Sequence, residues 1–291
     1  MVRRVRSDMG EAGRISAVIP TLDEEDRIGA AVATLRGEVG EVIVVDGGSR
    51  DATVSRAGAA GARVRVAPGA SRAVALNIGA ALATGEIVYF VHADCRPPRG
   101  FSGDIVHALA AGAGAGCFRL RFDSGHWLLR LSGWCTRADF ALVRYGDQSL
   151  FVTRRLLRDM RGYDERLTVM EDQDLVRRLR RRCRFVVVAR PVVASARRYR
   201  SHGVFRMQLV VYPVVVALYR LHAPPQIVAR VYRRLLAARS PHLHHSAGQA
   251  ADAGRTMAGW SGRSSSPLRS TSGSGSWARM TRRRLSPRST R

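Results

Sequence analysis

Short runs of β-branched residues alternate with helix-forming segments over residues 15–92, and this alternation is what most constrains the fold. The runs are typical of buried parallel strands and cover residues 15–20, 42–46, 64–66 and 87–92. Helical patterns lie between them at residues 24–35, 52–60 and 72–83. Strand–helix–strand repetition at this spacing predicts βαβ units. We therefore expect an α/β fold, with a mostly parallel central sheet flanked by helices.

Polar residues and glycines follow three of these predicted strands. They occupy positions 20–21, 46–48 and 92–94. Ligands of parallel sheets bind beyond the carboxyl ends of the strands, because the loops there converge on one edge. The sequence therefore predicts a binding crevice built from these three strand ends.

The second half of the chain has a less regular pattern. Helices are predicted at residues 125–140, 154–160 and 172–181, and strands at 150–153, 185–188 and 192–196. The glycine-rich stretch 112–116 precedes a predicted strand, so it lacks the context of a dinucleotide-binding loop. We interpret this stretch as a flexible linker.

An apolar segment at residues 204–221 leaves two interpretations open. It is interrupted at Tyr212–Pro213 and is shorter than the roughly 20 apolar residues needed to span a bilayer. It is either a pair of packing helices or a helical element that lies on a membrane surface. The second interpretation makes peripheral membrane contact, at the inner face, a hypothesis to test.

The chain ends differ in composition from the middle. Residues 1–13 contain three Arg but no apolar run, so we predict a flexible N-terminus and no signal peptide. Residues 14–235 form the predicted domain, which includes the apolar segment. Residues 240–291 are rich in Arg, Ser and Gly, and are predicted to be disordered. The four cysteines are widely separated without a Cys-x-x-Cys pair, which argues against zinc and a disulfide scaffold and favours a cytoplasmic location.

The formal net charge is +25, and Arg supplies all the cationic side chains apart from His because the chain has no Lys. Such a charge favours anionic partners such as nucleotide phosphates or a membrane surface. A basic nucleic-acid-binding protein is one alternative. Acidic strand ends and the lack of an aromatic-basic RNA motif argue against it, so we expect no specific nucleic-acid partner.

The segment after the second predicted strand carries Asp46, Gly47, Gly48 and Ser49. Asp46 at the strand tip can accept hydrogen bonds from a nucleobase N–H, and the two glycines let backbone approach a ligand closely. The alternative is a plain turn in which Ser49 caps the next helix.

The segment His92-Ala93-Asp94 follows another predicted strand. Asp94 can hold Mg²⁺ or Mn²⁺ against a diphosphate, since hard cations prefer oxygen ligands. His92 lies two residues earlier, on the same face of an extended strand. It is either a ligand-side residue or a hydrogen-bonded packing residue.

Three acids, Glu171, Asp172 and Asp174, open the predicted helix at 172–181. Acids are favoured at a helix N-terminus by the dipole alone. The functional interpretation is that one of them acts as a general base toward an acceptor hydroxyl. Asp174 is expected to cap the helix or to pair with an Arg.

Taken in order, these motifs resemble family-2 glycosyltransferases over roughly residues 14–232. Residues 18–25 are similar to the family's opening nucleotide-binding loop, and residues 46–53 are similar to its second loop. Asp94 resembles the second acid of its metal-binding Asp-x-Asp, and residues 171–172 resemble its catalytic acidic pair. His-Ala-Asp at 92–94, Gly-Asp-Gln at 146–148 and Ser-Ala-Arg-Arg at 195–198 resemble the bacterial subgroup associated with arsenosugar biosynthesis.

The resemblance implies a GT-A fold and a hexosyltransferase-like, inverting enzyme that uses a nucleotide-diphosphate sugar donor and Mg²⁺ or Mn²⁺. It assigns the metal to Asp94 and the catalytic base to Asp172. It places the remaining candidates on the donor side (Pro20, Thr21, Glu24, Asp46, Gly48, Arg72 and Asn77) and on the phosphate or acceptor side (His92, Gln148, Glu171, Arg197 and Arg198). Ion pairs with surface acids are the alternative role for the last two arginines. The acceptor is not implied.

Two positions depart from the family pattern. Asp23 stands where the opening loop usually has Asn, and Ala75 stands where a Gln usually precedes Asn77. These departures put donor affinity and donor choice in question, but not the fold. A nucleotidyltransferase on a related fold remains an alternative, although it usually has a glycine-rich basic loop where this chain has the acidic segment 20–25.

Overall fold

The computed structural model describes residues 14–137 and 148–237. The predicted flexible N-terminus at 1–13, the predicted tail at 240–291, and Gly146 and Asp147 lie outside these ranges, as do residues 138–140 of the predicted helix at 125–140.

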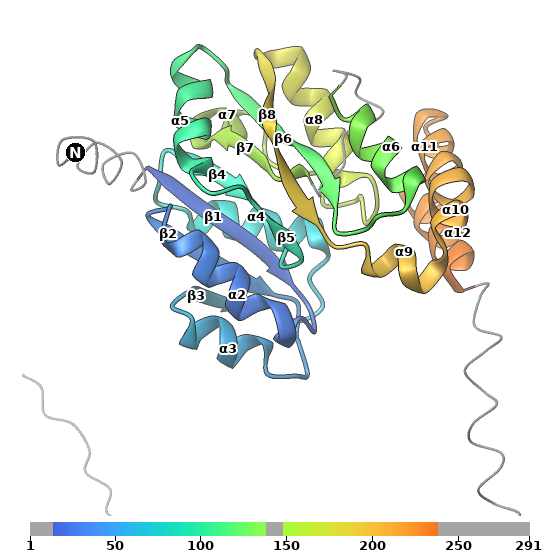
Figure 1. Cartoon of the computed structure of the whole chain (residues 1–291), viewed down its shortest axis with the longest axis horizontal. Helices are drawn as coiled ribbons and strands as arrows, with labels where there is room; N and C mark the ends of the chain where they lie inside the picture. The colour runs from blue at the N-terminus through green and yellow to red at the C-terminus, as the bar shows by residue number, and fades with distance from the viewer. Residues whose placement is uncertain (1–13, 138–147, 238–291) are drawn as a thin grey trace, which may run out of the picture. The chain divides into compact units, whose positions relative to one another are not determined.

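The described residues form an eight-stranded sheet with helices on both faces (Figure 1). The strands, in spatial order, are β3 (Arg63–Val66), β2 (Glu41–Asp46), β1 (Ile15–Thr21), β4 (Ile87–Phe90), β7 (Leu150–Thr153), β6 (Ala115–Phe122), β8 (Phe185–Ala194) and β5 (Cys95–Arg96). The pairs β1–β2, β1–β4, β2–β3 and β6–β8 are parallel, whereas β4–β7, β6–β7 and β5–β8 are antiparallel. The predicted α/β class with a mostly parallel sheet is confirmed, although the antiparallel pairing of β7 was not predicted.

The N-terminal half follows the predicted βαβ order. The crossover helices are α2 (Glu25–Arg36), α3 (Thr53–Ala59) and α4 (Arg72–Leu82). Helix α4 packs close to the sheet, because a Cβ atom on Gly79 would lie 2.2 Å from a methyl group of Val18. The Ser71 side chain accepts a hydrogen bond from the Val74 N–H, which caps this helix.

Alternate strand residues point into two separate cores. Ile15, Ala17 and Ile19 of β1 face the core that α2, α5 (Phe101–Ala110) and α6 (Trp127–Cys135) cover. Val18 faces the core that α4, α7 (Arg154–Asp159) and α8 (Glu171–Arg182) cover. Burial on both sheet faces explains the continuous apolar runs in the sequence.

Two local predictions were wrong. The strands predicted at 185–188 and 192–196 are one strand, β8, which pairs with β6 through an irregular register between Phe118 and Arg119. Pro191 sits just past this irregularity, where a strand tolerates proline. The glycine-rich stretch is not simply a linker, because Gly116 lies within β6. A Cβ atom there would lie 2.4 Å from the Phe151 ring.

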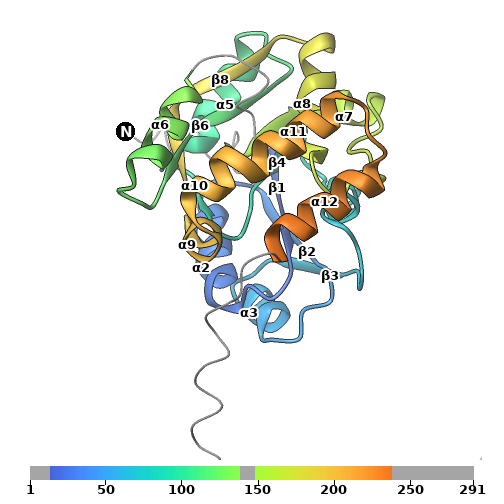
Figure 2. The same ribbon diagram turned by 90° about the vertical axis from the view of Figure 1, so that its right-hand side faces the viewer.

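The apolar segment is helical without the interruption predicted at Tyr212–Pro213. Helix α10 (Val204–Arg206), the π-helix η3 (Met207–Val211) and α11 (Tyr212–Arg220) follow one another directly. The π-helical turn before Pro213 accommodates a residue that lacks an N–H. Figure 2 shows α11 beside α12 (Pro225–Ala237), and Val215, Val216 and Val228 form the small core between them. No helix within the described ranges has the length and apolar character required to cross a bilayer.

Candidate active site

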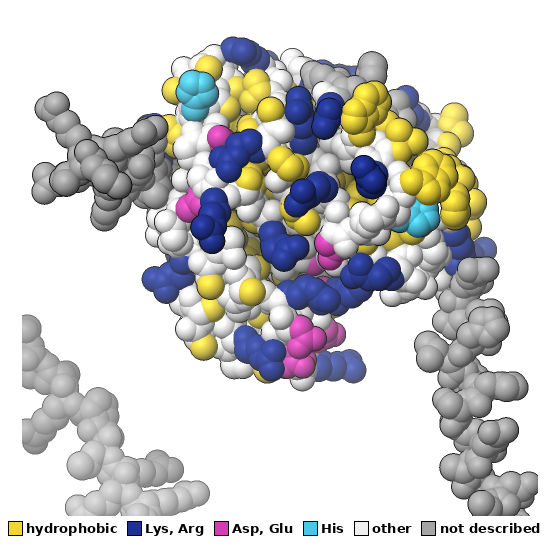
Figure 3. All heavy atoms as spheres, in the orientation of Figure 1, with side chains coloured by type: hydrophobic (Ala, Val, Ile, Leu, Met, Phe, Trp, Pro, Cys, Tyr) yellow, Lys and Arg dark blue, Asp and Glu magenta, His cyan; other side chains and the backbone are white. Residues whose placement is uncertain are grey.

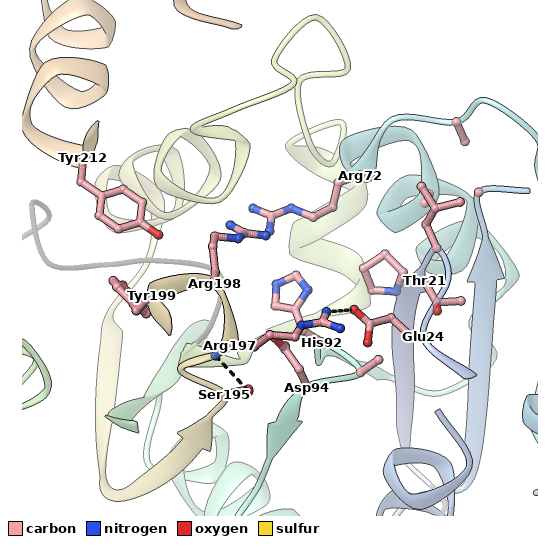
Figure 4. Close-up of a pocket in the computed structure, with 16 residues that line it drawn as sticks. Thr21, Glu24, Arg72, His92, Asp94, Ser195, Arg197, Arg198, Tyr199 and Tyr212 are labelled. Carbon is pink, nitrogen blue, oxygen red and sulfur yellow. Dashed lines mark hydrogen bonds and ion pairs between the residues drawn. The ribbon is translucent and has the colours of Figure 1, made fainter. Parts of the chain in front are cut away.

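A pocket of about 310 Å³ opens at the carboxyl ends of β1, β2 and β4 (Figure 4). Strand-end residues Pro20, Thr21, Gly47, His92 and Asp94 line one side. The other side consists of Arg72 and of residues at the start of α9 (Arg197–His202). The predicted meeting of the three strand ends is confirmed.

The first strand end presents Glu24 to the pocket. Its carboxylate accepts a hydrogen bond from Arg27 at 3.1 Å and pairs with Arg197. The Glu24 backbone N–H donates to the Thr53 hydroxyl at 2.8 Å, which fastens this loop to the start of α3. Thr21 and Glu24 therefore lie together at the strand-end side of the pocket.

Asp46 faces its own loop instead of the pocket. Its side chain is fully buried and accepts hydrogen bonds from the backbone N–H groups of Gly48 and Ser49, at 2.9 and 2.8 Å, and from the Ser49 hydroxyl. Gly48 has a φ angle of 102°, which suits glycine. In this conformation Asp46 shapes the loop and does not line the pocket.

Asn77 and Gln148 are also held away from the pocket. The Asn77 amide donates to the Tyr163 carbonyl at 3.0 Å and accepts from the Tyr163 N–H at 2.9 Å. The Gln148 side chain is buried, and its amide oxygen accepts from the Cys117 thiol at 3.2 Å. Both residues connect elements of the fold at their observed positions.

Asp94 lines the pocket beyond β4, where its backbone carbonyl accepts a hydrogen bond from the Ser195 N–H at 3.1 Å. Among residues 14–137 and 148–237, no three His, Cys, Asp or Glu side chains cluster as a metal site. The described residues thus offer a carboxylate rather than a complete set of metal ligands. This fits Mg²⁺ or Mn²⁺ shared with a diphosphate, because Mg²⁺ typically binds one or two carboxylates together with substrate phosphates.

His92 lies in the turn after β4, which ends at Phe90, and not on an extended strand shared with Asp94 as the sequence predicted. Burial lowers the pKa of His92 to about 3, and the positive charges of Arg72 and Arg198 act in the same direction against the opposing effect of Asp94. The imidazole is therefore neutral near pH 7.

Three arginines gather around His92. Figure 4 shows the guanidinium groups of Arg72 and Arg198 beside each other on one side of the imidazole, and Arg197 directed toward Glu24. The predicted alternative of an ion pair applies to Arg197, since it pairs with Glu24. Clustered guanidinium groups are well shaped for phosphate oxygens.

Arg72 also connects the pocket to the acidic end of α8. Its guanidinium pairs with Glu171 and, at 2.5 Å, with Asp172. Glu171 is 1% exposed and Asp172 is 7% exposed, so the Arg72 guanidinium compensates two buried carboxylates. The Glu171 Oε2 atom has no hydrogen-bond partner within the described chain.

A second cavity of about 240 Å³ lies on the far side of Arg72. It shares Arg72, Arg198, Tyr199 and Tyr212 with the first pocket, and Glu171 and Asp172 belong to its wall. Sequence reasoning missed the two tyrosines. Tyr199 lies within an arginine-rich run and Tyr212 within an apolar segment, so neither residue gave a signal beyond its polar ring tip.

Asp174 has a structural role, as the sequence indicated. Its carboxylate accepts hydrogen bonds from Arg177, Arg178 and Tyr219 at 2.9, 2.7 and 2.9 Å. Burial alone raises the pKa of Asp174, but these three hydrogen bonds outweigh it and hold the pKa below its ordinary value.

Comparison with known proteins shows similarity to glycosyltransferases. Residues 16–159 match the model of Glycosyl transferase family 2. Glucosyl-3-phosphoglycerate synthase of Mycolicibacterium smegmatis is 38% identical over 104 residues, which cover 31% of this chain. The match spans only about a third, 34%, of that relative's own length.

Two solved structures show the fold alone. Glucosyl-3-phosphoglycerate synthase from Mycobacterium tuberculosis, in complex with Mn²⁺, UDP-glucose and phosphoglyceric acid, has a TM-score of 0.52 at 22% identity, over 75% of this chain and 83% of that one. A mannosyltransferase from Pyrobaculum calidifontis, in complex with GDP-Man and Mn²⁺, has a TM-score of 0.53 at 18% identity, over 77% and 74%.

The sheet topology, the strand-end pocket and these likenesses define a GT-A-type α/β protein. Over residues 16–159, the chain is similar to glycosyl transferase family 2.

Proposed function

We propose that this protein is a metal-dependent, inverting glycosyltransferase that moves a hexose from a nucleotide-diphosphate donor to a hydroxyl acceptor. The observation that carries the proposal is that a candidate metal-binding carboxylate and a candidate catalytic base lie on opposite sides of the Arg72 side chain. Asp94 and Arg197 line the pocket on one side of Arg72, Asp172 and Glu171 line the cavity on the other, and Arg198 borders both.

The first pocket suits the donor. The nucleoside would lie against Pro20, Thr21 and Glu24, and the diphosphate would face the arginine cluster. Asp94 would hold Mg²⁺ or Mn²⁺, which neutralises charge on a leaving diphosphate. The guanidinium groups of Arg72, Arg197 and Arg198 would stabilise the same charge through hydrogen bonds.

The second cavity suits the acceptor. Asp172 in its wall would accept the proton of the acceptor hydroxyl as that oxygen attacks the anomeric carbon. Attack from the side opposite the leaving diphosphate inverts the configuration. Arg72 holds the Asp172 carboxylate in place before the donor arrives, and the donor diphosphate would compete for the same guanidinium group.

The similar proteins indicate which donor and acceptor to test first. The names of the similar synthases make UDP-glucose the first donor to test and phosphoglycerate the first acceptor. The narrower resemblance to the arsenosugar-associated subgroup depends on residues 92–94, 146–148 and 195–198 alone. We place the reaction in the cytoplasm, since all four cysteines are free thiols.

A thermal-shift screen tests the proposal. UDP-, GDP- and dTDP-sugars are added with Mn²⁺ to the wild type and to Asp94→Ala, because a ligand that binds only the native state raises the unfolding temperature. Asp159→Ala, which removes an exposed carboxylate elsewhere, is the matched control. We expect one donor class to stabilise the wild type and the control but not Asp94→Ala.

Activity measurements complete the test. Asp94→Ala should lose metal-dependent transfer or donor hydrolysis while its fold is retained. Full activity of this variant, or of the wild type in excess EDTA, would contradict the metal assignment. If no nucleotide sugar stabilises the wild type, the donor assignment is wrong.

A further inference from the structure

Helix α6 is apolar on its outward face as well as on its buried face. Leu129 and Gly133 are its buried residues. Trp127, Leu131 and Trp134 lie four and three residues apart, so they share one side of the helix. They are 60%, 47% and 60% exposed. Surface helices normally place polar residues on that side, so core packing does not explain this stripe.

A second exposed stripe lies on the helical segment α10–η3–α11. The centroids of the Phe205 and Trp127 rings lie 6.1 Å apart. The His126 ring stacks on Trp127 and meets Phe205 edge-on, so the stripes are continuous. We name the combined set the apolar surface, and it consists of Trp127, Leu131, Trp134, Phe205, Leu209, Val210 and Val214. Figure 3 shows apolar side chains gathered at the side of the molecule where these helices lie, with arginines among them.

A basic groove of about 1060 Å³ borders α6. Its arginines are Arg96, Arg119, Arg121, Arg130 and Arg137. None of these five forms an ion pair within the described part of the chain. Asp123 in the groove is already engaged, since it accepts from the Ala196 N–H at 2.6 Å and pairs with Arg200 at 3.5 Å.

From this geometry we infer that the apolar surface and the basic groove together dock on an anionic lipid bilayer. Exposed Trp, Phe and Leu side chains enter the boundary between headgroups and acyl chains, and adjacent arginines pair with anionic headgroups. Trp is favoured at that boundary because its ring is apolar while its N–H is polar.

Two other occupants fit less well. A second copy of the chain, packed across a two-fold axis, would bring like-charged arginine grooves near each other. A single-stranded nucleic acid would use the arginines and tryptophans, but it would leave Leu131, Leu209, Val210 and Val214 without a partner.

The docking surface lies on the outer side of the acceptor cavity. Ser132 of α6 and Tyr212 and Val215 of α11 line that cavity from within. The same two helices would therefore contact lipid with one face and enclose the cavity with the other.

The test is flotation of the full-length protein with vesicles of phosphatidylcholine, alone or mixed with phosphatidylglycerol. Two double variants probe the surface: Trp127→Ser with Phe205→Ser, and Arg130→Gln with Arg137→Gln. The matched controls are Val66→Ser, an exposed apolar residue on β3, and Arg65→Gln with Arg155→Gln, which removes the same charge elsewhere. Thermal unfolding confirms that each variant folds.

We expect the wild type to bind only the anionic vesicles. The apolar double variant should bind them at least about tenfold more weakly, since two large side chains no longer leave water. The arginine double variant should bind more weakly at low salt, with the difference shrinking as salt rises, and the controls should stay within about twofold of wild type.

Three outcomes would overturn the inference. Both surface variants could bind vesicles like the wild type, which would assign binding to another part of the chain. The wild type could be a dimer that the apolar double variant dissociates, which would make the surface a contact between copies. The surface variants could lose affinity for a single-stranded oligonucleotide while vesicle binding is unchanged, which would make nucleic acid the partner.

Discussion

Arg72 connects the donor pocket to the acidic end of α8. Its guanidinium lines both cavities and pairs with two carboxylates that lie 99 and 100 residues further along the chain. Sequence reasoning placed Arg72 near the donor and Asp172 at the acceptor, but no periodicity or local motif could show that they pair. The sequence also could not show which way the Asp46 carboxylate points, because a side chain at the end of a strand can face either the pocket or its own loop.

Asp172→Asn tests the catalytic base. The substitution keeps the size of the side chain but removes the carboxylate that we propose as the acceptor of the hydroxyl proton, so we expect turnover to fall at least about 10²-fold. Donor affinity should stay within about threefold, since the base acts on the acceptor. Steady-state kinetics and donor titration separate the two effects. Intact turnover with weakened donor binding would instead make Asp172 a donor-side or structural residue.

Arg72→Gln should affect both catalysis and folding. The variant leaves the buried Glu171 carboxylate without its cation, so we expect a loss of about 2 kcal/mol in the free energy of unfolding together with weaker donor binding. The double variant Arg72→Gln with Glu171→Gln should recover part of the stability but not the donor affinity. Urea unfolding of the single and double variants measures this coupling. Additive losses would mean that the pair does not stabilise the fold.

At the scale of elements, the sequence predicts best where the chain repeats. The βαβ segments from β1 to β4 have both faces of the sheet buried, so their composition alone identifies them. Prediction failed where local signals conflict with packing. Proline led the sequence analysis to split β8 at Pro191 and the α10–α11 segment at Pro213, and the glycines at the start of β6 resembled a linker. Helices α5 and α12 were missed altogether. In each failed case, contacts from distant segments decide the structure.

Helix α8 depends on Asp174, and Asp174→Asn should destabilise the protein. The carboxylate joins Arg177 and Arg178 of the same helix to Tyr219 of α11, and Arg178 continues to the carbonyls of Met160 and Gly162 at 2.9 and 2.7 Å. We expect a loss of about 2 kcal/mol at pH 7, because removing one member of a buried network leaves the others with unmet hydrogen bonds.

The pH dependence of that loss has a defined sign. The folded-state pKa of Asp174 is lowered from its ordinary value of 3.8, so the unfolded state takes up the proton first as pH falls. The stability that Asp174 contributes is therefore complete above about pH 4 and decreases as pH falls through the lowered pKa. Urea unfolding of wild type and variant from pH 7 to pH 3 should show the gap narrowing. A constant gap would mean that the charge of Asp174 is not involved.

At the scale of the whole molecule, the site is assembled from segments that no local pattern connects. The strand-end rule predicts from the sequence that residues 20–21, 46–48 and 92–94 lie at one edge of the sheet, and the structure brings these strand ends together. It could not place α8, α9 and α11 around that edge, because the packing of these helices depends on both cores together. The exposed stripe on α6 was not predicted either, since apolar residues at helical spacing normally indicate burial.

Removing residues 241–291 separates the enzyme hypothesis from the nucleic-acid-binding alternative. Those residues carry nine Arg and one acidic residue, whereas the proposed donor pocket and the proposed acceptor cavity are both built from residues 20–232. A chain that ends at Ser240 should keep its donor-induced thermal shift and its turnover within about twofold. Its affinity for single-stranded oligonucleotides should fall and become less salt-dependent, because fewer phosphate contacts release fewer counterions. Its binding to anionic vesicles should persist and still require Trp127 and Phe205. Loss of turnover on truncation would place part of the active site in the removed segment. Unchanged oligonucleotide affinity would mean that residues 1–240 themselves bind nucleic acid.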